Sequence, residues 1–458
     1  MTRRLTRQGV IVGSLLSGLV VANACAGDPP KRAVQASDGG EAGGGGEGGK
    51  GPPASNGGEP SSLAGMPGMM GDAGEGGDVN TSTAGAGGAP PQGGMPAAAG
   101  VSNEPTAGAP PIMPQCEGNL VFADSYVDQL VHTAVDTLGP ITSANVANLT
   151  ELAIPFNDQS VDLTGLECLQ SLTKLDLDRG EQDGMEVLLD LPNLRTITFS
   201  APYGVDLVAL GKLTQITSLD LRGLREADFS ALASLTGLEE LNLSGVGPFN
   251  PVPVDITVLN ELTNLKSLDL SYVIVEDGAP LASLTKLERL SLNGALLPTI
   301  TPILGLTKLR SLDLSSTQIT TIPSLTAFTQ LTSLDISYNT FTDFTPLASH
   351  TILTELNVAS TTLPSLTSIA PLTSLVTLNV SNNALTDVTA LGALPAITSL
   401  DLSFNGNVTS VHPLVTSAYI DAGDTVDLVG VGDCSDPFLT DFQAIKDKNV
   451  AIEDGCGI

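Results

Sequence analysis

The sequence predicts an α/β-type repeat solenoid, in which short parallel strands line a concave face and a capping unit closes each end. The first observation behind this prediction is a recurring pattern, Leu-x-x-Leu-x-Leu, whose starts are separated by 23 residues, then 22 three times, then 27, then 22 six times. A fixed period of this length is typical of units that bury their apolar edges only by stacking on one another. The second is composition: the chain has no Trp and 3% aromatic residues, so the core must be aliphatic. The segments start at Leu149, Leu172, Leu194, Ile216, Leu238, Leu265, Leu287, Leu309, Leu331, Leu353, Leu375 and Ile397.

Residues 1–25 have the pattern of a cleaved export signal. A basic start with Arg3, Arg4 and Arg7 precedes an apolar stretch over 10–21, which is too short to span a bilayer as a helix. Small residues over 22–24 then precede Cys25. This arrangement resembles a bacterial lipoprotein signal, in which the cysteine is lipidated and becomes the first mature residue. The departure is Ala22, where such signals usually have Leu, and the alternative is an ordinary cleavage site with an incidental cysteine.

A Gly-, Pro- and Ala-rich segment follows over 26–115, and its composition predicts a disordered linker. Residues 116–148 form the expected N-terminal cap. Within it, apolar residues at helical spacing predict an amphipathic helix over 125–138, with Ser125 and Asp128 at its start and Gly139-Pro140 after its end. The repeats occupy 149–417.

The C-terminal cap is expected over 418–458, with a helix opening at Asp436-Pro437 and a final strand around Val450 and Ile452. Four cysteines besides Cys25 allow three disulfide pairings. Because two of them lie near each end of the repeats, we expect the pairs Cys116–Cys168 and Cys434–Cys456. Redox or metal chemistry is the rival interpretation, but there is no Cys-x-x-Cys and the chain has only three His.

Within each repeat, the leucines should point into the core while the x positions line the concave face. The return path carries apolar residues three apart, such as Phe341 and Phe344, which favours 3₁₀ or extended turns over full helices. The one 27-residue step contains an insertion around 247–253. It is expected to form a loop on the flank of the solenoid.

The motifs Val121-Phe122-Ala123-Asp124 and Leu163-Thr164-Gly165-Leu166-Glu167-Cys168, together with repeats such as 331–339, resemble bacterial internalin-like leucine-rich repeat proteins. The resemblance covers about 116–458. It implies a secreted or surface-attached module that binds other proteins. The departure is the asparagine expected after each strand. Asn occurs at 157, 339, 383 and 405 and Thr at 317 and 361, whereas 180, 202, 224, 246, 273 and 295 carry other residues, so we expect a looser turn in the middle repeats.

Charge and composition exclude several function classes. The net charge of −31 disfavours nucleic acid as a partner. No catalytic triad or phosphate-binding glycine motif is present, so we expect no enzyme, no metal and no cofactor. His350 stands in an otherwise apolar column and is expected to be structural.

Basic residues predict where a ligand would dock. Seven of them fall at concave positions, namely Lys174, Arg179, Arg195, Arg222, Lys266, Arg289 and Arg310, and no Lys or Arg lies between Arg310 and Lys446. We expect a protein or an anionic glycan to bind near Arg195, Arg222, Lys266, Arg289 and Arg310, with Tyr272 as an aromatic anchor. The alternative is that these cations pair internally with Asp220, Asp269 and Asp313.

Taken together, the sequence predicts an exported, non-enzymatic protein of the bacterial envelope that recognises a macromolecule through its concave face. An outer-surface lipoprotein, attached to the membrane only by its lipid, is the expected location, and secretion is the alternative. The alternative function is a structural or adhesive envelope component without a discrete ligand.

Overall fold

The computed structural model describes residues 116–155, 160–178, 182–200, 204–226, 228–247 and 252–457. The expected signal, linker and lipidation residue Cys25 lie outside the described residues. So do Asn157, Arg179 and the centre of the insertion, 248–251.

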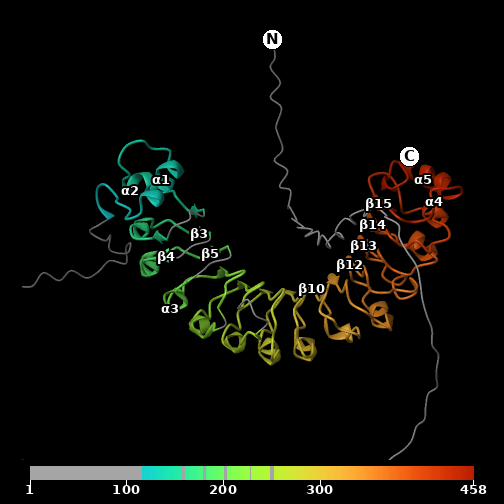
Figure 1. The fold of residues 1–458 in the computed structure, drawn as a ribbon, viewed down its shortest axis with the longest axis horizontal. Coiled ribbons are helices and arrows are strands. Elements are labelled where there is room, and N and C mark those ends of the chain that lie inside the picture. The colour runs from blue at the N-terminus through green and yellow to red at the C-terminus, as the bar shows by residue number, and fades with distance from the viewer. Residues whose placement is uncertain are drawn as a thin grey trace, which may run out of the picture. The chain divides into compact units, whose positions relative to one another are not determined.

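The described part from residue 116 onward is a solenoid whose strands form one parallel sheet along the inner side of an arc (Figure 1). Every strand pairs with the strand of the next repeat in register, so that Leu268 lies beside Leu290 and Leu290 beside Leu312. The sheet contains β1 Glu151–Ile154, β3 Lys174–Leu177, β5 Thr196–Phe199, β6 Ser218–Asp220, β7 Glu240–Asn242, β8 Ser267–Asp269, β9 Arg289–Ser291, β10 Ser311–Asp313, β11 Ser333–Asp335, β12 Glu355–Asn357, β13 Thr377–Asn379, β14 Ser399–Asp401, β15 Thr425–Asp427 and β16 Ala451–Glu453. The predicted fold class is therefore confirmed.

In most of the three-residue strands the central residue points into the core. In β8, Leu268 is buried whereas Ser267 and Asp269 on either side are partly exposed on the concave face. The same alternation recurs along the sheet, as expected for side chains that point to opposite faces.

The convex side is built from short turns, which Figure 1 shows along the outer side of the arc. Phe341 and Phe344, three residues apart on this side, meet edge to face with ring centroids 5.8 Å apart. The predicted 3₁₀ or extended convex path is confirmed, with one α-helical turn, α3 Leu207–Leu210. The 3₁₀ segments are η2 Leu166–Cys168, η3 Met185–Asp190, η4 Ser230–Ser234, η5 Thr257–Asn260, η6 Ala279–Ser283, η7 Thr301–Gly305, η8 Leu325–Ala327, η9 Thr345–Ser349 and η10 Thr389–Ala393, and a small ladder pairs β2 Val161–Asp162 with β4 Gln182–Asp183.

The N-terminal end carries two helices, α1 Ser125–Ala134 and α2 Ser143–Val146. The predicted capping residue of α1 is wrong: Asp124, rather than Ser125, accepts the N–H groups of Tyr126 and Val127. The helix is also shorter than predicted, since Asp136 adopts a left-handed φ of 49° soon after Ala134. Leu138 is consequently exposed.

A disulfide joins Cys116 to Cys168 and so ties the start of this end to η2. Gly165, just before η2, has a φ of 107°, and a Cβ there would lie 2.6 Å from the carbonyl oxygen of Val121. Only glycine permits this close approach of the two backbones.

The C-terminal end continues the sheet rather than merely covering it. β15 and β16 extend the parallel ladder beyond the twelve predicted strands, and β16 is the strand expected around Ile452. Two helices, α4 His412–Thr416 and α5 Phe438–Lys446, lie beside these strands. None of the described helices is long and apolar enough to cross a bilayer.

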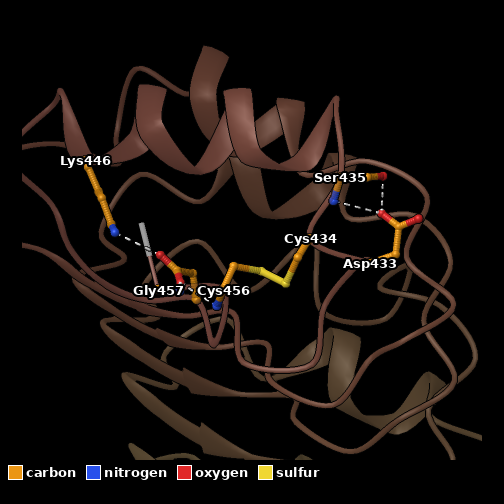
Figure 2. Close-up of a disulfide and its surroundings, with 7 residues drawn as sticks. Asp433, Cys434, Ser435, Lys446, Cys456 and Gly457 are labelled. Carbon is orange, nitrogen blue, oxygen red and sulfur yellow. Dashed lines mark hydrogen bonds and ion pairs between the residues drawn. A yellow bond between two sulfur atoms is a disulfide. The ribbon is translucent and has the colours of Figure 1, made fainter.

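A second disulfide, Cys434–Cys456, closes this end (Figure 2). Next to it, Nζ of Lys446 lies 2.8 Å from Oδ2 of Asp454, whose Oδ1 accepts the N–H groups of Cys456 and Gly457. Burial alone would raise the pKa of Asp454, but these bonds outweigh it and lower the pKa. The charged carboxylate therefore holds the disulfide-bearing turn on α5.

The turn after each strand is closed in two different ways. In the C-terminal repeats a side chain bonds the carbonyl three residues earlier: Asn339 donates to Ile336 at 3.1 Å and Asn405 to Leu402 at 2.9 Å. In the middle repeats an apolar residue takes the place of this Asn, and its backbone N–H donates to the carbonyl three residues earlier. Ala295, for example, donates to the carbonyl of Leu292 at 2.9 Å. The expected loosening of the middle turns is thus wrong, because the backbone replaces the missing side chain.

Candidate interaction surface on the concave face

The structure separates the predicted docking residues into two groups. Arg195, Lys266 and Arg310 immediately precede their strands, and Arg289 opens β9. Arg222 and Tyr272 instead follow β6 and β8, at the carboxyl edge of the sheet. The six residues therefore do not form one patch.

Most of the cations are paired across neighbouring repeats. Lys266 lies 2.8 Å from Glu239, and Arg310 lies 3.7 Å from Glu288. Arg289 reaches 3.2 Å from Glu240, passing Ser267 of the intervening strand.

Pairing within the molecule is therefore the alternative that the structure shows, but the expected partners were mostly wrong. Asp220 does pair with Arg222, whereas glutamates of other repeats take the place of Asp269 and Asp313. Arg195 differs from the others, since its Nη1 donates to the carbonyls of Pro192 and Leu194. Ion pairs exposed to this degree contribute about 0–1 kcal/mol each, so they orient the side chains without closing the surface.

A groove of about 770 Å³ runs along the carboxyl edge of the sheet, and we call it the edge groove. Its bed is left open by Gly223 and Gly245, which have no side chains, and the Tyr272 ring borders it. The complete lining is Asp178, Ser200, Arg222, Gly223, Ser244, Gly245, Asp269, Ser271, Tyr272, Asn293 and Asp313.

The glycines and Tyr272 occupy the same position of successive repeats, the second residue after the central Leu–x–Leu of the strand. All three have left-handed backbone, with φ of 72°, 62° and 61°. Each donates its N–H to the next repeat, as Tyr272 does to the carbonyl of Asn293 at 2.7 Å, so the ladder fixes this conformation. Sequence analysis identified Tyr272 but not the left-handed column to which it belongs, because the column lies just beyond the hydrophobic pattern of each repeat.

Tyr272 stands out from the glycines in this column. It is 69% exposed, and a Cβ on Gly294 of the next repeat would lie 2.7 Å from its ring. The ring therefore leans over Gly294 and presents an aromatic face at the end of the edge groove.

The side chains that line the edge groove include three aspartates and one cation. Burial raises the pKa of Asp313, and the neighbouring charge of Asp335 raises it further. The hydrogen bonds from Ser315 lower this pKa but do not outweigh the rise. The bond to Asp220, with the nearby charge of Asp269, raises the pKa of Arg222 and keeps it charged. Oδ1 of Asn293, a lining residue, is buried without a hydrogen-bond partner. These groups suit a ligand that supplies hydrogen-bond donors, and they disfavour an anionic one.

The histidines do not form a catalytic group. His350 is buried, its Nε2 lies 3.4 Å from the carbonyl of Phe328, and burial lowers its pKa. His412 contacts Asp441 at 3.0 Å, beside the C-terminal helices. Within the described ranges, no group of three or more His, Cys, Asp or Glu side chains is arranged to hold a metal ion.

Comparisons with known proteins agree with this architecture. The family model "Leucine Rich repeats (2 copies)" matches residues 307–349 and 373–415. An internalin of Listeria monocytogenes, InlF, is 26% identical over 68% of this chain and 95% of its own, with a TM-score of 0.53. A leucine-rich repeat protein of Leptospira interrogans is 17% identical over 63% of this chain and 92% of its own, with a TM-score of 0.47. A search of curated proteins finds no match.

The family-model match and the likeness to a solved internalin agree with three features of the fold. These are the 22-residue period, the parallel concave sheet and the 3₁₀ convex side. The chain therefore has the leucine-rich repeat fold and is similar to a solved internalin.

Proposed function

We propose that this protein is a non-enzymatic interaction module that recognises another protein through the edge groove. Curved repeat solenoids commonly use their concave surface for binding. The observation that carries the proposal is the edge groove itself, where an exposed aromatic ring and a charged guanidinium border an open bed. Tyr and Arg are enriched among the residues that dominate binding energy at protein interfaces.

A protein ligand fits the edge groove better than an anionic glycan. Asp178, Asp269 and Asp313 line the groove, whereas its single lining cation, Arg222, is already held by Asp220. A protein surface offers backbone and side-chain donors to these carboxylates, while a polyanion would be repelled by them.

The repeats supply substitutions that test the edge groove without disturbing the fold. Arg222→Ser places the residue found at Ser244 and Ser271, and Tyr272→Gly places the residue found at Gly245 and Gly294. Lys308→Ser is the matched control, because it also removes one exposed positive charge but lies outside the groove lining.

The experiment is affinity capture from envelope extracts and neighbouring cells, with the partner identified and its affinity measured for each variant. The double variant combines Arg222→Ser with Tyr272→Gly. A partner that binds the native chain and the Lys308→Ser control equally, but binds the double variant at least tenfold more weakly, would support recognition at the edge groove. Equal binding by all three proteins would reject the groove. It would favour the alternative of a structural or adhesive component.

The two disulfides and the internalin likeness indicate an exported protein, because disulfides persist in oxidising compartments. We propose further that Cys25 carries a lipid that holds the protein at the outer surface of the envelope. Labelling cells with a fatty-acid analogue should mark the native chain but not a Cys25→Ala variant. An unlabelled native chain recovered in the medium would support secretion instead.

A further inference from the structure

A second feature of the carboxyl edge lies along its C-terminal half. The left-handed column that contains Tyr272 continues through Ser316, Tyr338, Ser360, Asn382 and Phe404, all with φ between 53° and 56°. Each N–H donates to the following repeat, so the backbone conformation is required whatever the side chain. Glycine or asparagine adopts it at little cost, whereas a bulky side chain there is rare.

Aromatic residues occur in this column at a regular interval. Tyr272, Tyr338 and Phe404 are each three repeats apart, 66 residues in sequence, and are 69%, 66% and 61% exposed. Among the described residues, Tyr419 is the only other Tyr or Phe side chain that is exposed. Tyr338 and Phe404 lie beyond the edge groove, and the proposed function makes no use of them.

The concave column beside Tyr338 and Phe404 carries carboxylates and no cation. Asp335, Asp401 and Asp427 occupy the concave column of β11, β14 and β15, and the chain has no Lys or Arg between Arg310 and Lys446. Burial raises the pKa of Asp427, and the charges of Asp401 and Glu453 in the flanking strands raise it further. The edge groove shows that this concave column and the left-handed column border one surface, since Asp269 and Tyr272 both line it.

We infer that Tyr338 and Phe404 form a docking row for an extended cationic segment of a partner protein. Rings beside uncompensated carboxylates attract Arg and Lys side chains, which stack on aromatic faces. Three strand spacings amount to about 14 Å, and so do four residues of an extended chain. The segment therefore carries its basic residues at every fourth position, so that successive cations meet successive rings.

The test uses the full chain and a fluorescent Gly/Ser peptide with Arg at every fourth position. Two peptides serve as comparisons, one with Glu in place of Arg and one with the same arginines side by side. The variant is Tyr338→Asn with Phe404→Asn, because Asn382 already holds the same backbone conformation. Ser316→Asn with Ser360→Asn is the matched control in the same column.

The spaced Arg peptide should bind the native chain and the control equally, and should bind the aromatic variant about tenfold more weakly. It should also bind more tightly than the contiguous Arg peptide, while the Glu peptide should not bind. Undiminished binding by the aromatic variant, equal binding of the contiguous peptide, or no binding by the native chain would each overturn the inference. Because Arg222 and Tyr272 are unchanged throughout, a difference in binding between the aromatic variant and its control does not depend on the edge groove.

Discussion

The repeats over 216–305 and those over 309–410 share one backbone but differ in the chemistry that closes it. In the first region Leu224, Val246, Val273 and Ala295 follow the strands as buried apolar residues, and their own N–H groups bond the carbonyl three residues earlier. In the second region Thr317, Asn339, Thr361, Asn383 and Asn405 bond that same carbonyl through their side chains.

The two regions also bridge neighbouring repeats differently. Nδ2 of Asn405 reaches back to Val380 of the preceding repeat at 2.9 Å, whereas in the first region the N–H of Val275 bonds the carbonyl of Leu296. The difference teaches that the backbone carbonyls at the turn after each strand must be hydrogen-bonded, but that the donor can be either a side chain or a backbone N–H group. Buried backbone groups must be paired, and either solution meets that demand.

The largest effect should come from the disulfides at the two ends of the solenoid, which lie outside both regions. Replacing Cys116 and Cys168 by Ser should destabilise the N-terminal end by about 4 kcal/mol, and replacing Cys434 and Cys456 the C-terminal end by about 3 kcal/mol, because the first loop is longer. Hydrogen exchange of the amides at each end measures this. Loss of protection spreading equally over all repeats would contradict a local effect.

Asn405→Val tests whether the two turn closures are interchangeable. Asn405 is fully buried and donates to three carbonyls, so its loss should leave unpaired groups and cost about 3 kcal/mol. Denaturant unfolding measures the change. If the variant loses less than about 1 kcal/mol, the backbone of the second region has adopted the closure of the first.

The reverse exchange, Val273→Asn, should cost about 2 kcal/mol. Val273 is fully buried, and its N–H already bonds the carbonyl of Leu270, so an added amide would be buried without a waiting partner. Val273→Ala is a control that removes volume without adding a polar group. An Asn variant more stable than the Ala variant would show that an asparagine ladder can extend into the first region.

The smallest effect should follow Asp313→Asn, in the strand that opens the second region. Because burial raises the pKa of Asp313 in the folded state, folding favours the protonated form, and stability falls as pH rises from the unfolded pKa of about 3.9 through the folded pKa. Asn occupies the same column at Asn357 and Asn379 and retains an acceptor for Ser315.

The Asn variant should therefore be more stable than the native chain at pH 7, and the difference should disappear in acid. Unfolding curves at the two pH values provide the measurement, with Asp343→Asn as a control on an exposed convex carboxylate whose pKa is lowered. A difference that is unchanged by pH would contradict the role of the charge.

Much of the fold could be predicted from the sequence because its determinants are local. The 22-residue period fixes which leucines enter the core, and the position of each cysteine near an end favours the observed pairing. The boundary of α1 could not be predicted, because the competition between Asp124 and Ser125 for the cap is decided by backbone geometry.

The candidate site was harder to predict, because its residues meet only after the repeats are stacked. Sequence reasoning identified Arg222 and Tyr272, and both border the edge groove. It grouped them with Lys266 and Arg289, which the structure places elsewhere on the surface and pairs with glutamates of other repeats.

The sequence by itself determined the repeat, the aliphatic core, the parallel sheet and the acidic character, because each follows from residue type and spacing along the chain. Tertiary structure alone decided which charges neutralise one another. Arg289 and Glu240 are 49 residues apart in the sequence and pair across an intervening strand that carries the small Ser267. It also decided that one column is left-handed, because the hydrogen bonds that impose this conformation come from the next repeat.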